Sequence, residues 1–476
     1  MRSTKLILFA IIIAILLAGC GGGNAPASSP TSSANTSSKP AATASAITPV
    51  PQPAGSTKIT FWYGLSGHNG DVVQEVINKY NQSQKKYYVE GVFQSSYDDT
   101  LNKFNASLAS QDLPNIVQIY DIGTQRMIDT KQIIPIQDLV NRDHLQSLVD
   151  DLEPAIRSYY TIGGKLYSMP FNSSTAVMYF DKNAFRDAGL DPNKKIWTYD
   201  ELLQAAQKLT KKDASGKASR VGVAFYDYAW LFEEEMAVHN QLYAQPDNGR
   251  TQRATKYIFN SNPGVQWLEL QKKLLSNGTA LYYGVNGANT ASAALLTGKA
   301  AITFDSIASL RTYVDTAKKN GGKVDVGVAY LPRQTSAQGR TIIGGASLWI
   351  TNKGTKEQQE GAWDFIKFAT QKDTQVFWSS NTGYVPIRLS AYDLPEMKEA
   401  LSKYPQFQVA IDQIRAAPTN YYNAGCVSGN MLAVRNYVQQ ATDDYLTGHV
   451  SSAQTALDTA VKKSNDSLDE YNASNQ

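Results

Sequence analysis

The chain has 476 residues, of which 42% are hydrophobic and 18% are charged. That length and composition suffice to bury a large core, and we expect the chain to form more than one globular unit. The formal net charge is +3, and the Lys and Arg residues are scattered along the sequence rather than bunched. Such a charge pattern lacks the basic face of nucleic-acid-binding proteins, so we expect no nucleic-acid partner.

The N-terminus has the pattern of a lipoprotein signal peptide. Arg2 and Lys5 precede an apolar run over residues 6–17, which is too short to favour a membrane-spanning helix. The run ends in Leu-Ala-Gly-Cys, a pattern in which the cysteine, here Cys20, is lipidated and becomes the mature N-terminus. We therefore expect residues 1–20 to be a signal peptide, and the exported protein to be lipid-anchored to the outer face of the cell membrane, at the cell surface or in the periplasm. A plain secretory signal with an incidental cysteine is the alternative.

Residues 21–56 are dominated by Gly, Ser, Thr, Ala, Asn and Pro, with Lys39 as the single charge. A segment of this composition cannot bury enough apolar surface to offset its ordering entropy, so we expect a disordered tether. Cys426 has no disulfide partner once Cys20 carries lipid, and we expect it to be a small buried side chain.

Apolar patterning after residue 57 alternates between strands and helices. Residues 59–63, 87–93 and 115–120 are strand-like, and apolar positions recur at helical spacing over residues 72–80. This alternation is typical of βαβ units and a parallel sheet. Further strands are expected at 171–180, 301–304, 324–330 and 345–350, and helices at 202–209 after a capping box at 198–201, at 265–275, at 362–368 and over most of 394–471.

Ligands of open α/β sheets bind beyond the carboxyl ends of the strands. The segments 63–70, 95–97 and 120–123 follow predicted strands and contain polar and aromatic residues. The chain has 27 Tyr and 7 Trp residues, and aromatic rings with a polar edge suit the recognition of hydroxylated solutes. These loops are therefore the places where we expect a binding site.

Several classes of catalytic and metal site lack support. No Gly-rich loop followed by Lys and Ser or Thr is present, so the chain is not itself a P-loop ATPase, and no Gly-x-Ser-x-Gly motif is present. The histidines His68, His144, His239 and His449 lack the spacing of a zinc site. The acidic run 233–235 is expected to be a solvated helix face. We therefore expect no catalytic residue, metal, cofactor or enzymatic activity.

Six segments, taken in chain order, form a recognisable pattern. They are Gln-Ile-Tyr-Asp-Ile-Gly-Thr at 118–124, Pro-Phe-Asn-Ser-Ser-Thr-Ala-Val at 170–177, Asp-Lys-Asn-Ala-Phe at 181–185, Ile-Ile-Gly-Gly-Ala-Ser-Leu-Trp at 342–349, Asn-Thr-Gly-Tyr-Val-Pro-Ile at 381–387, and Gly-Asn-Met at 429–431 with Arg435. The pattern resembles the glycerol-phosphate receptors of bacterial ABC importers, within the extracellular solute-binding protein family 1. The resemblance covers nearly all of the chain after the tether.

The resemblance implies a two-lobe α/β fold of the periplasmic-binding-protein type (type II). Each lobe would be a mostly parallel sheet flanked by helices, and hinge strands between the lobes would let them close around a ligand. The first lobe would comprise residues 57–168 and 308–368, and the second lobe residues 169–307 and 369–476.

The resemblance also implies a set of ligand-binding residues. The phosphate cradle would comprise Ser174, Ser306, Gly344 or Gly345, Tyr384 and Arg435, and the glycerol-side contacts would be Tyr97, Asp121 and Trp230. A phosphate dianion needs charge-assisted donors, which arginine, hydroxyl groups and glycine amides supply. A carboxylate faces a dianion only at a cost, so we expect Asp121 to lie at the opposite end of the site, accepting hydrogen bonds from glycerol hydroxyls.

Two departures from the family pattern concern the glycerol side. Where the family has a pair of tryptophans, the segment 227–230 retains only Trp230, and the loop 64–67 lacks an acidic residue. Both changes favour a wider pocket that accommodates a glycerophosphodiester such as glycerophosphocholine. The expected partners are the glycerol phosphate ligand and the permease and ATPase subunits of the importer, and the protein is expected to be a monomer.

Two other functions are alternatives. A receptor for a neutral oligosaccharide would leave a buried Arg435 without a counter-charge, so an Arg435 without a partner would favour phosphate. A secreted glycoside hydrolase would need two carboxylates that flank the cleft, and the sequence nominates only Asp121.

Overall fold

The computed structural model describes residues 45–337 and 339–475. The predicted signal peptide with Cys20, and residues 21–44 of the predicted tether, lie outside the described residues. Among the helices that the structure describes, none combines the length and the apolar character needed to cross a membrane.

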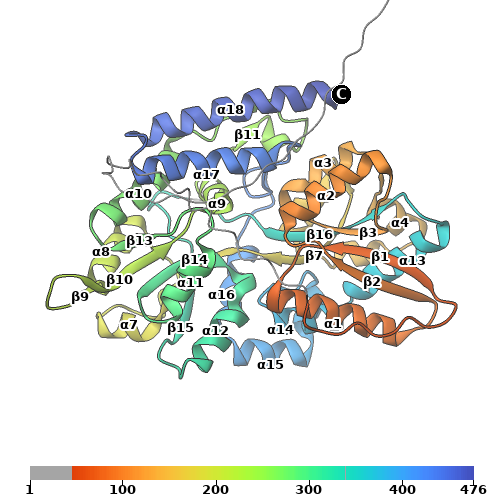
Figure 1. The fold of residues 1–476 in the computed structure, drawn as a ribbon, viewed down its shortest axis with the longest axis horizontal. Coiled ribbons are helices and arrows are strands. Elements are labelled where there is room, and N and C mark those ends of the chain that lie inside the picture. The colour runs from red at the N-terminus through yellow and green to blue at the C-terminus, as the bar shows by residue number, and fades with distance from the viewer. Residues whose placement is uncertain (1–44, 338, 476) are drawn as a thin grey trace, which may run out of the picture. The chain divides into compact units, whose positions relative to one another are not determined.

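Two sheets form the framework (Figure 1). The first sheet has the order β2-β1-β3-β16-β4, with β7 on β16, and the second has the order β13-β10-β14-β8-β15, with β9 on β10. We call the parts of the chain built on them the first and second lobes. The strands of the first sheet are β1 (Thr57–Tyr63), β2 (Tyr87–Phe93), β3 (Ile116–Tyr120), β4 (Ile133–Ile134), β7 (Met169–Ser174) and β16 (Gly344–Thr351). Those of the second are β8 (Ala176–Asp181), β9 (Lys211–Lys212), β10 (Ala218–Phe225), β13 (Ala280–Tyr282), β14 (Ala300–Ser306) and β15 (Val326–Tyr330). Two small pairs are β5 (Thr161–Ile162) with β6 (Lys165–Leu166) and β11 (Ala244–Gln245) with β12 (Lys256–Tyr257).

Helices pack around both sheets, and their buried faces follow apolar residues at helical spacing. The predicted capping box is confirmed at the start of α8, where Thr198 Oγ1 accepts from the Glu201 amide at 3.2 Å. The helices of at least nine residues are α1 (Gly67–Ser83), α2 (Tyr97–Ser110), α8 (Tyr199–Leu209), α9 (Ala229–Val238), α10 (Asn262–Ser276), α11 (Ala288–Leu296), α12 (Leu310–Lys319), α13 (Lys356–Ala369), α14 (Lys372–Asn381), α15 (Pro395–Lys403), α16 (Gln406–Arg415), α17 (Met431–Thr447) and α18 (Ala453–Ser474). The shorter ones are η1 (Asp121–Gly123), α3 (Thr124–Asp129), α4 (Ile136–Arg142), α5 (Gln146–Asp150), α6 (Pro154–Tyr160), α7 (Lys182–Asp187), η2 (Asp247–Gly249), η3 (Ile307–Ser309) and η4 (Leu389–Asp393).

The sheets are mixed rather than mostly parallel. β1 pairs in parallel with β2 and β3, and β10 pairs in parallel with β13 and β14. β16 is antiparallel to β3, β4 and β7, and β8 is antiparallel to β14 and β15. Both β8 and β16 arrive from the other lobe. Each of these two strands therefore starts beside the carboxyl ends of the parallel strands and runs antiparallel to them.

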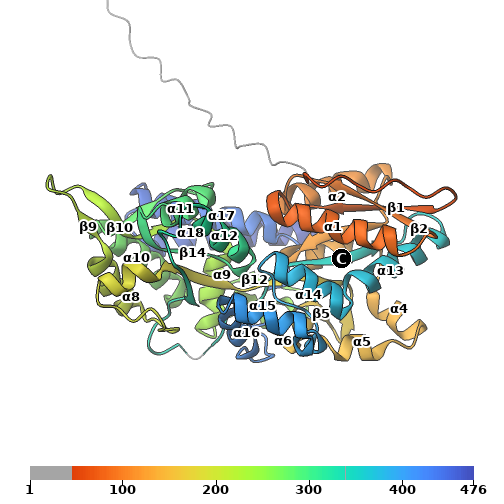
Figure 2. The ribbon, with the colours of Figure 1, turned by 90° about the horizontal axis from the view of Figure 1, so that it is seen from below.

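Buried polar side chains connect the two points at which the chain crosses between the lobes. The strand predicted over 171–180 is two strands, because β7 belongs to the first sheet and β8 to the second, with Thr175 between them. The chain returns to the first sheet between β15 and β16. Thr175 Oγ1 donates to Thr341 Oγ1 at 3.1 Å and accepts from Gln413 Nε2 at 2.7 Å. These buried hydrogen bonds tie both crossings to α16, which also contacts β15. Helix α16 lies beside α6 (Figure 2).

The lobe boundaries expected from the sequence differ from the sheet assignments. Residues 308–368 were expected in the first lobe, but β15 lies in the second sheet. Residues 369–476 were expected in the second lobe, but α14 packs against α1 of the first lobe. The rings of Phe171 on β7 and Trp378 on α14 lie 4.8 Å apart, which places α14 on the first sheet. Which lobe an element belongs to therefore depends on where the chain crosses between the lobes. The positions of the family-like segments in the sequence do not give those crossing points.

The predicted tether extends too far toward the folded body. Residues 45–56 lie along α1 instead of being free, because α1 side chains pair with their backbone. Asn78 accepts from the Val50 amide at 3.1 Å and donates to the Thr48 carbonyl at 2.9 Å. The Ala46 amide donates to Asp71 at 2.6 Å.

Replacing Gly345 with Ala is expected to destabilise the fold. Gly345 has a φ of +103°, and a Cβ there would lie 1.8 Å from the backbone oxygen of Asn172 on β7. Because the β7–β16 ladder would have to separate, we expect the free energy of unfolding to fall by about 2–4 kcal/mol. Gly164→Ala is the matched control, since Gly164 has a φ of +77° and no atom within 4 Å of its Cβ position. Equal losses in denaturant unfolding would contradict this close approach.

Candidate functional site

The residues expected to bind ligand lie at the ends of strands in both sheets. Tyr97 is the first residue of α2, and Asp121 directly follows β3. Ser174 ends β7 in the first sheet, and Ser306 ends β14 in the second. These positions match the rule that ligands of α/β sheets bind beyond the carboxyl ends of strands.

Arg435 on α17 is the charged centre of this region and is 8% exposed. Its Nε donates to Glu233 Oε1 at 2.7 Å, and its Nη2 donates to Glu233 Oε2 at 3.0 Å. Nη2 also donates to Asp121 Oδ2 at 2.7 Å, and Nη1 donates to Asp121 Oδ1 at 3.4 Å. The Tyr120 ring lies beneath, with its centroid 5.6 Å from the guanidinium carbon. Burial opposes the charged form, but the charges of Asp121 and Glu233 outweigh it and raise the pKa of Arg435.

The expectation that Asp121 lies at the opposite end of the site from Arg435 is wrong. The two side chains form a direct ion pair, and Asp121 is only 3% exposed. The physical reason is that a buried guanidinium requires a carboxylate close by. Arg435 also does not lack a counter-charge, so the feature that was expected to favour phosphate over a neutral sugar is not present.

The acidic run 233–235 is buried on α9, so its prediction as a solvated helix face is wrong. Each glutamate has its own partner. Glu233 pairs with Arg435, Glu234 accepts from the Ile342 amide at 2.8 Å, and Glu235 accepts from the Tyr199 hydroxyl at 2.5 Å. Burial raises the pKa of Glu235 to about 8. The available signal was the flanking sequence, because apolar residues on both sides of the run are typical of a helix buried all round.

Tyr97 and Tyr384 connect the first lobe to this centre. Tyr97 stacks on Tyr120 with ring centroids 5.3 Å apart, and its hydroxyl lies 3.2 Å from that of Tyr384. Asn172 Nδ2 donates to the Tyr97 hydroxyl at 2.8 Å. Tyr384 in turn stacks on Trp378 at 5.5 Å. The predicted contacts Tyr97, Asp121, Tyr384 and Arg435 are thus joined through Tyr120 in one continuous cluster.

Ser174, Gly344 and Trp230 form a second group. Gly344 pairs with Ser174 across the β7–β16 ladder, and Gly345 pairs with Ser173. A Cβ on Gly344 would lie 2.4 Å from the Trp230 ring, so the absence of a side chain lets the indole reach β16. Trp230 is 2% exposed, and its Nε1 has no hydrogen-bond partner among the residues that the structure describes.

Ser306 ends β14 in the second lobe and makes local hydrogen bonds with its neighbours. Ser306 Oγ accepts from the Ala308 amide at 3.1 Å, and Asp305 accepts from the Ser306 amide at 2.7 Å. Burial raises the pKa of Asp305 to about 6. The pKa of Tyr228 is raised by burial, lowered by Arg435, and raised further by Asp121 and Asp305. The Tyr228 ring lies 5.6 Å from that of Trp230, one of the expected site residues, and the sequence analysis nominated neither Asp305 nor Tyr228.

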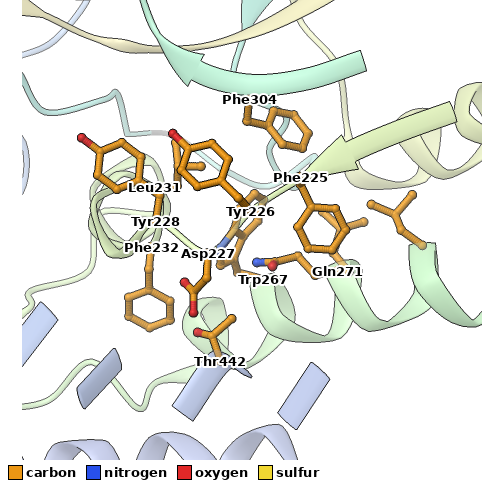
Figure 3. A pocket seen from close by; sticks show the side chains of 12 residues that line it. Phe225, Tyr226, Asp227, Tyr228, Leu231, Phe232, Trp267, Gln271, Phe304 and Thr442 are labelled. Atoms are coloured by element: carbon orange, nitrogen blue, oxygen red, sulfur yellow. The ribbon is translucent and has the colours of Figure 1, made fainter. Parts of the chain in front are cut away.

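Asp227 points away from the site despite its position beside Tyr228. Figure 3 shows its carboxyl group directed toward Thr442 on α17, while the hydroxyls of Tyr226 and Tyr228 point to the other side. The cavity there has a volume of about 10 Å³, which is room for at most one water molecule. Burial raises the pKa of Asp227 well above its usual value, and Asp443 adds to the shift. This small pocket, lined mainly by apolar and aromatic side chains of α9, α10 and β10, is part of the packing of the second lobe.

The chain is similar to known solute-binding proteins over most of its length. A family model described as bacterial extracellular solute-binding protein matches residues 75–408. The sn-glycerol-3-phosphate-binding periplasmic protein UgpB of Yersinia enterocolitica is 32% identical over 426 residues, which are 88% of this chain and 94% of that protein. The protein of the same name from Escherichia coli is 30% identical over 439 residues, covering 91% of this chain and 95% of the relative.

Solved structures have the same fold. UgpB from Mycobacterium tuberculosis, in complex with glycerophosphocholine, has a TM-score of 0.72 at 20% identity and covers 88% of this chain and 100% of that one. The GacH receptor of Streptomyces glaucescens, solved unliganded and in complex with acarbose, has a TM-score of 0.71 at 16% identity and covers 87% of this chain and 99% of that one. The two-lobe fold of periplasmic solute-binding proteins is therefore confirmed. The chain belongs to the family of bacterial extracellular solute-binding proteins.

Proposed function

We propose that the protein is the extracytoplasmic receptor of a bacterial ABC importer, which binds sn-glycerol 3-phosphate or a glycerophosphodiester such as glycerophosphocholine between its lobes. It delivers this ligand to separate permease and ATPase subunits. The observation that carries the proposal is the 32% identity, over 426 residues, to a protein named for binding sn-glycerol 3-phosphate.

The proposed ligand-binding residues come from the cluster around Arg435, from the group around Ser174 and Gly344, and from the end of β14 in the second lobe. They are Tyr97, Asp121, Ser174, Trp230, Ser306, Gly344, Gly345, Tyr384 and Arg435. Hydroxyl groups, glycine amides and the Arg435 guanidinium supply the donors that a phosphate requires. Asp121 accepts from glycerol hydroxyls beside Arg435, at the same end of the site rather than at the opposite one.

The proposed receptor does not turn its ligand over. A glycoside hydrolase needs one carboxylic acid to protonate the leaving group and a second carboxylate across the bond. Asp121 and Glu233 instead both bind the Arg435 guanidinium, so neither is placed to protonate a leaving group or to attack across a glycosidic bond. Binding and release are therefore the whole of the proposed activity.

A receptor for a neutral oligosaccharide is the second candidate. Because Glu233 and Asp121 already neutralise Arg435, an uncharged ligand would leave no guanidinium without a counter-charge. Asp121 and the tyrosines would then bind sugar hydroxyls and pack on sugar faces.

A thermal-shift panel separates these candidates. The mature protein is heated alone and with glycerol 3-phosphate, glycerophosphocholine, maltose or trehalose, and a ligand that binds only the folded state raises the melting temperature. We expect one or both glycerol phosphate compounds to raise it and the sugars to leave it unchanged. A shift with maltose or trehalose alone would establish the oligosaccharide receptor instead. Hydrolysis products in the same samples would contradict a binding-only activity.

Arg435→Ala is expected to weaken the binding of glycerol 3-phosphate by about 2–5 kcal/mol, because it removes the cation and leaves two buried carboxylates without their partner. Isothermal titration calorimetry measures the change. Arg388→Ala is the matched control, since it removes another half-buried ion pair, with Asp151 at 2.6 Å, outside the site. Unchanged affinity in a folded Arg435→Ala protein would contradict the assigned role.

Anchoring through Cys20 is tested with the full-length chain expressed in a bacterium. With residues 1–20 as signal peptide and a lipidated Cys20, the protein is expected to partition into the detergent phase of a cloud-point extraction. Cys20→Ala is expected to move it to the aqueous phase, because the acyl chains supply most of the membrane affinity. Detergent partition that survives the substitution would refute lipidation at this residue.

A further inference from the structure

We propose that Glu233 is a positioning residue of the ligand site. Glu233 holds one edge of the Arg435 guanidinium. The ligand binds the other edge, where it replaces Asp121. The inference rests on the proposed function and assigns separate tasks to the two carboxylates that contact Arg435.

The geometry divides the guanidinium into two edges. Glu233 binds the Nε and Nη2 edge at 2.7 and 3.0 Å, which are ordinary lengths for a bidentate charge-assisted pair. Asp121 binds the Nη1 and Nη2 edge, with 2.7 Å to Nη2 but 3.4 Å to Nη1. The Nη1 contact is at the weak limit of a hydrogen bond. Glu233 is therefore the tighter partner, and Nη1 is the loosely held end.

Donor counting identifies the atom that a ligand would meet. Arginine has five N–H donors, one on Nε and two on each Nη. Glu233 engages two of them and Asp121 two more, and the fifth is the second N–H of Nη1. A ligand oxygen can take this donor directly, and can take those of Asp121 if it displaces that carboxylate.

The two carboxylates differ in where they are mounted. Glu233 lies on α9, which contacts α17 and α10, so Glu233 and Arg435 are held by helices packed against one another. Because α10 also contacts β13 of the second sheet, these helices belong to the second lobe. Asp121 lies on η1, which also contacts α17 but directly follows β3 of the first sheet and so moves with that sheet. A change in the angle between the lobes therefore alters the Asp121–Arg435 contact and leaves the Glu233–Arg435 contact in place.

These separate roles of Glu233 and Asp121 favour ligands that carry a strong hydrogen-bond acceptor. When a phosphate replaces Asp121 on the Nη1 edge, Arg435 keeps two anionic partners, and Glu233 still fixes its orientation. A ligand without an acceptor of comparable strength cannot displace Asp121, because the exchange would leave the guanidinium with one partner in a buried site.

The test compares Glu233→Gln with Glu233→Asp. Glutamine has the shape of glutamate but lacks its charge, whereas aspartate keeps the charge and leaves a void. If Glu233 positions Arg435, we expect Glu233→Gln to weaken the binding of glycerol 3-phosphate and glycerophosphocholine at least about tenfold, and Glu233→Asp to retain more affinity. If Glu233 only fills space, the order is reversed.

Glu235→Gln is the matched control, because Glu235 is a neighbouring buried glutamate on α9 whose partner is Tyr199, away from Arg435. It is expected to leave both affinities within about twofold of wild type. Equal affinities for Glu233→Gln and wild type, or a larger loss in Glu233→Asp, would overturn the proposal.

A crystal structure of Glu233→Gln without ligand tests the role of Glu233 independently of the proposed function. We expect the guanidinium to turn away from residue 233 toward Asp121, and an unmoved guanidinium would overturn the proposal. Failure of wild type to bind either phosphate compound would instead overturn the proposed function, and this structure would still decide the role of Glu233. If Glu233→Gln does not fold, the crystal structure of Glu233→Asp decides the role of Glu233. A guanidinium that keeps its Nε contact with residue 233 supports the positioning role, and a guanidinium that loses this contact contradicts that role.

Discussion

The structure depends on one buried guanidinium that two carboxylates from different lobes share. Moving Arg435 out of water is costly, and only close anionic partners make its position in the interior tolerable. Glu233 and Asp121 are those partners, and meeting this requirement brings α17, α9 and the end of β3 together. Tyr120 lies against the same charge, Tyr97 stacks on Tyr120, and the hydroxyls of Tyr97 and Tyr384 are hydrogen-bonded. A ligand that binds here must satisfy the same constraint.

The helix that carries Glu233 also reaches the crossings between the lobes. Glu234, the next residue, accepts a hydrogen bond from the Ile342 amide, in the segment that leads from β15 back to β16. Thr341, beside it, accepts from Thr175 at the other crossing. Adjacent residues of α9 thus contact the binding region and the crossing segments. This arrangement joins the Arg435 cluster to the segments that cross between the lobes.

Sequence patterns were sufficient for the local elements and insufficient for their pairing. Strands β1, β2 and β3 and the capped start of α8 follow from short-range apolar and capping patterns, and the structure confirms them. The split of 171–180 at Thr175 was not predicted, because both halves are buried strands and they differ in the sheet that each one joins.

Sequence patterns were likewise insufficient to predict which residues of the site contact one another. The resemblance nominated Asp121 and Arg435, but their ion pair joins residues 314 positions apart, and no local pattern encodes it. Glu233 was missed because three consecutive acidic residues are normally solvated, and charged side chains are rarely buried without partners. Its partner lies 202 positions away. The resemblance therefore nominated these residues, and only the fold showed which of them touch.

The most direct test is a crystal structure of the mature protein with bound glycerol 3-phosphate. The account predicts the phosphate between the lobes, with an oxygen about 3 Å from Arg435 Nη1, Glu233 still on Nε, and Asp121 displaced from Nη1. A phosphate elsewhere on the protein, or a ligand between the lobes that leaves the Asp121–Arg435 pair intact and makes no contact with the guanidinium, would contradict it.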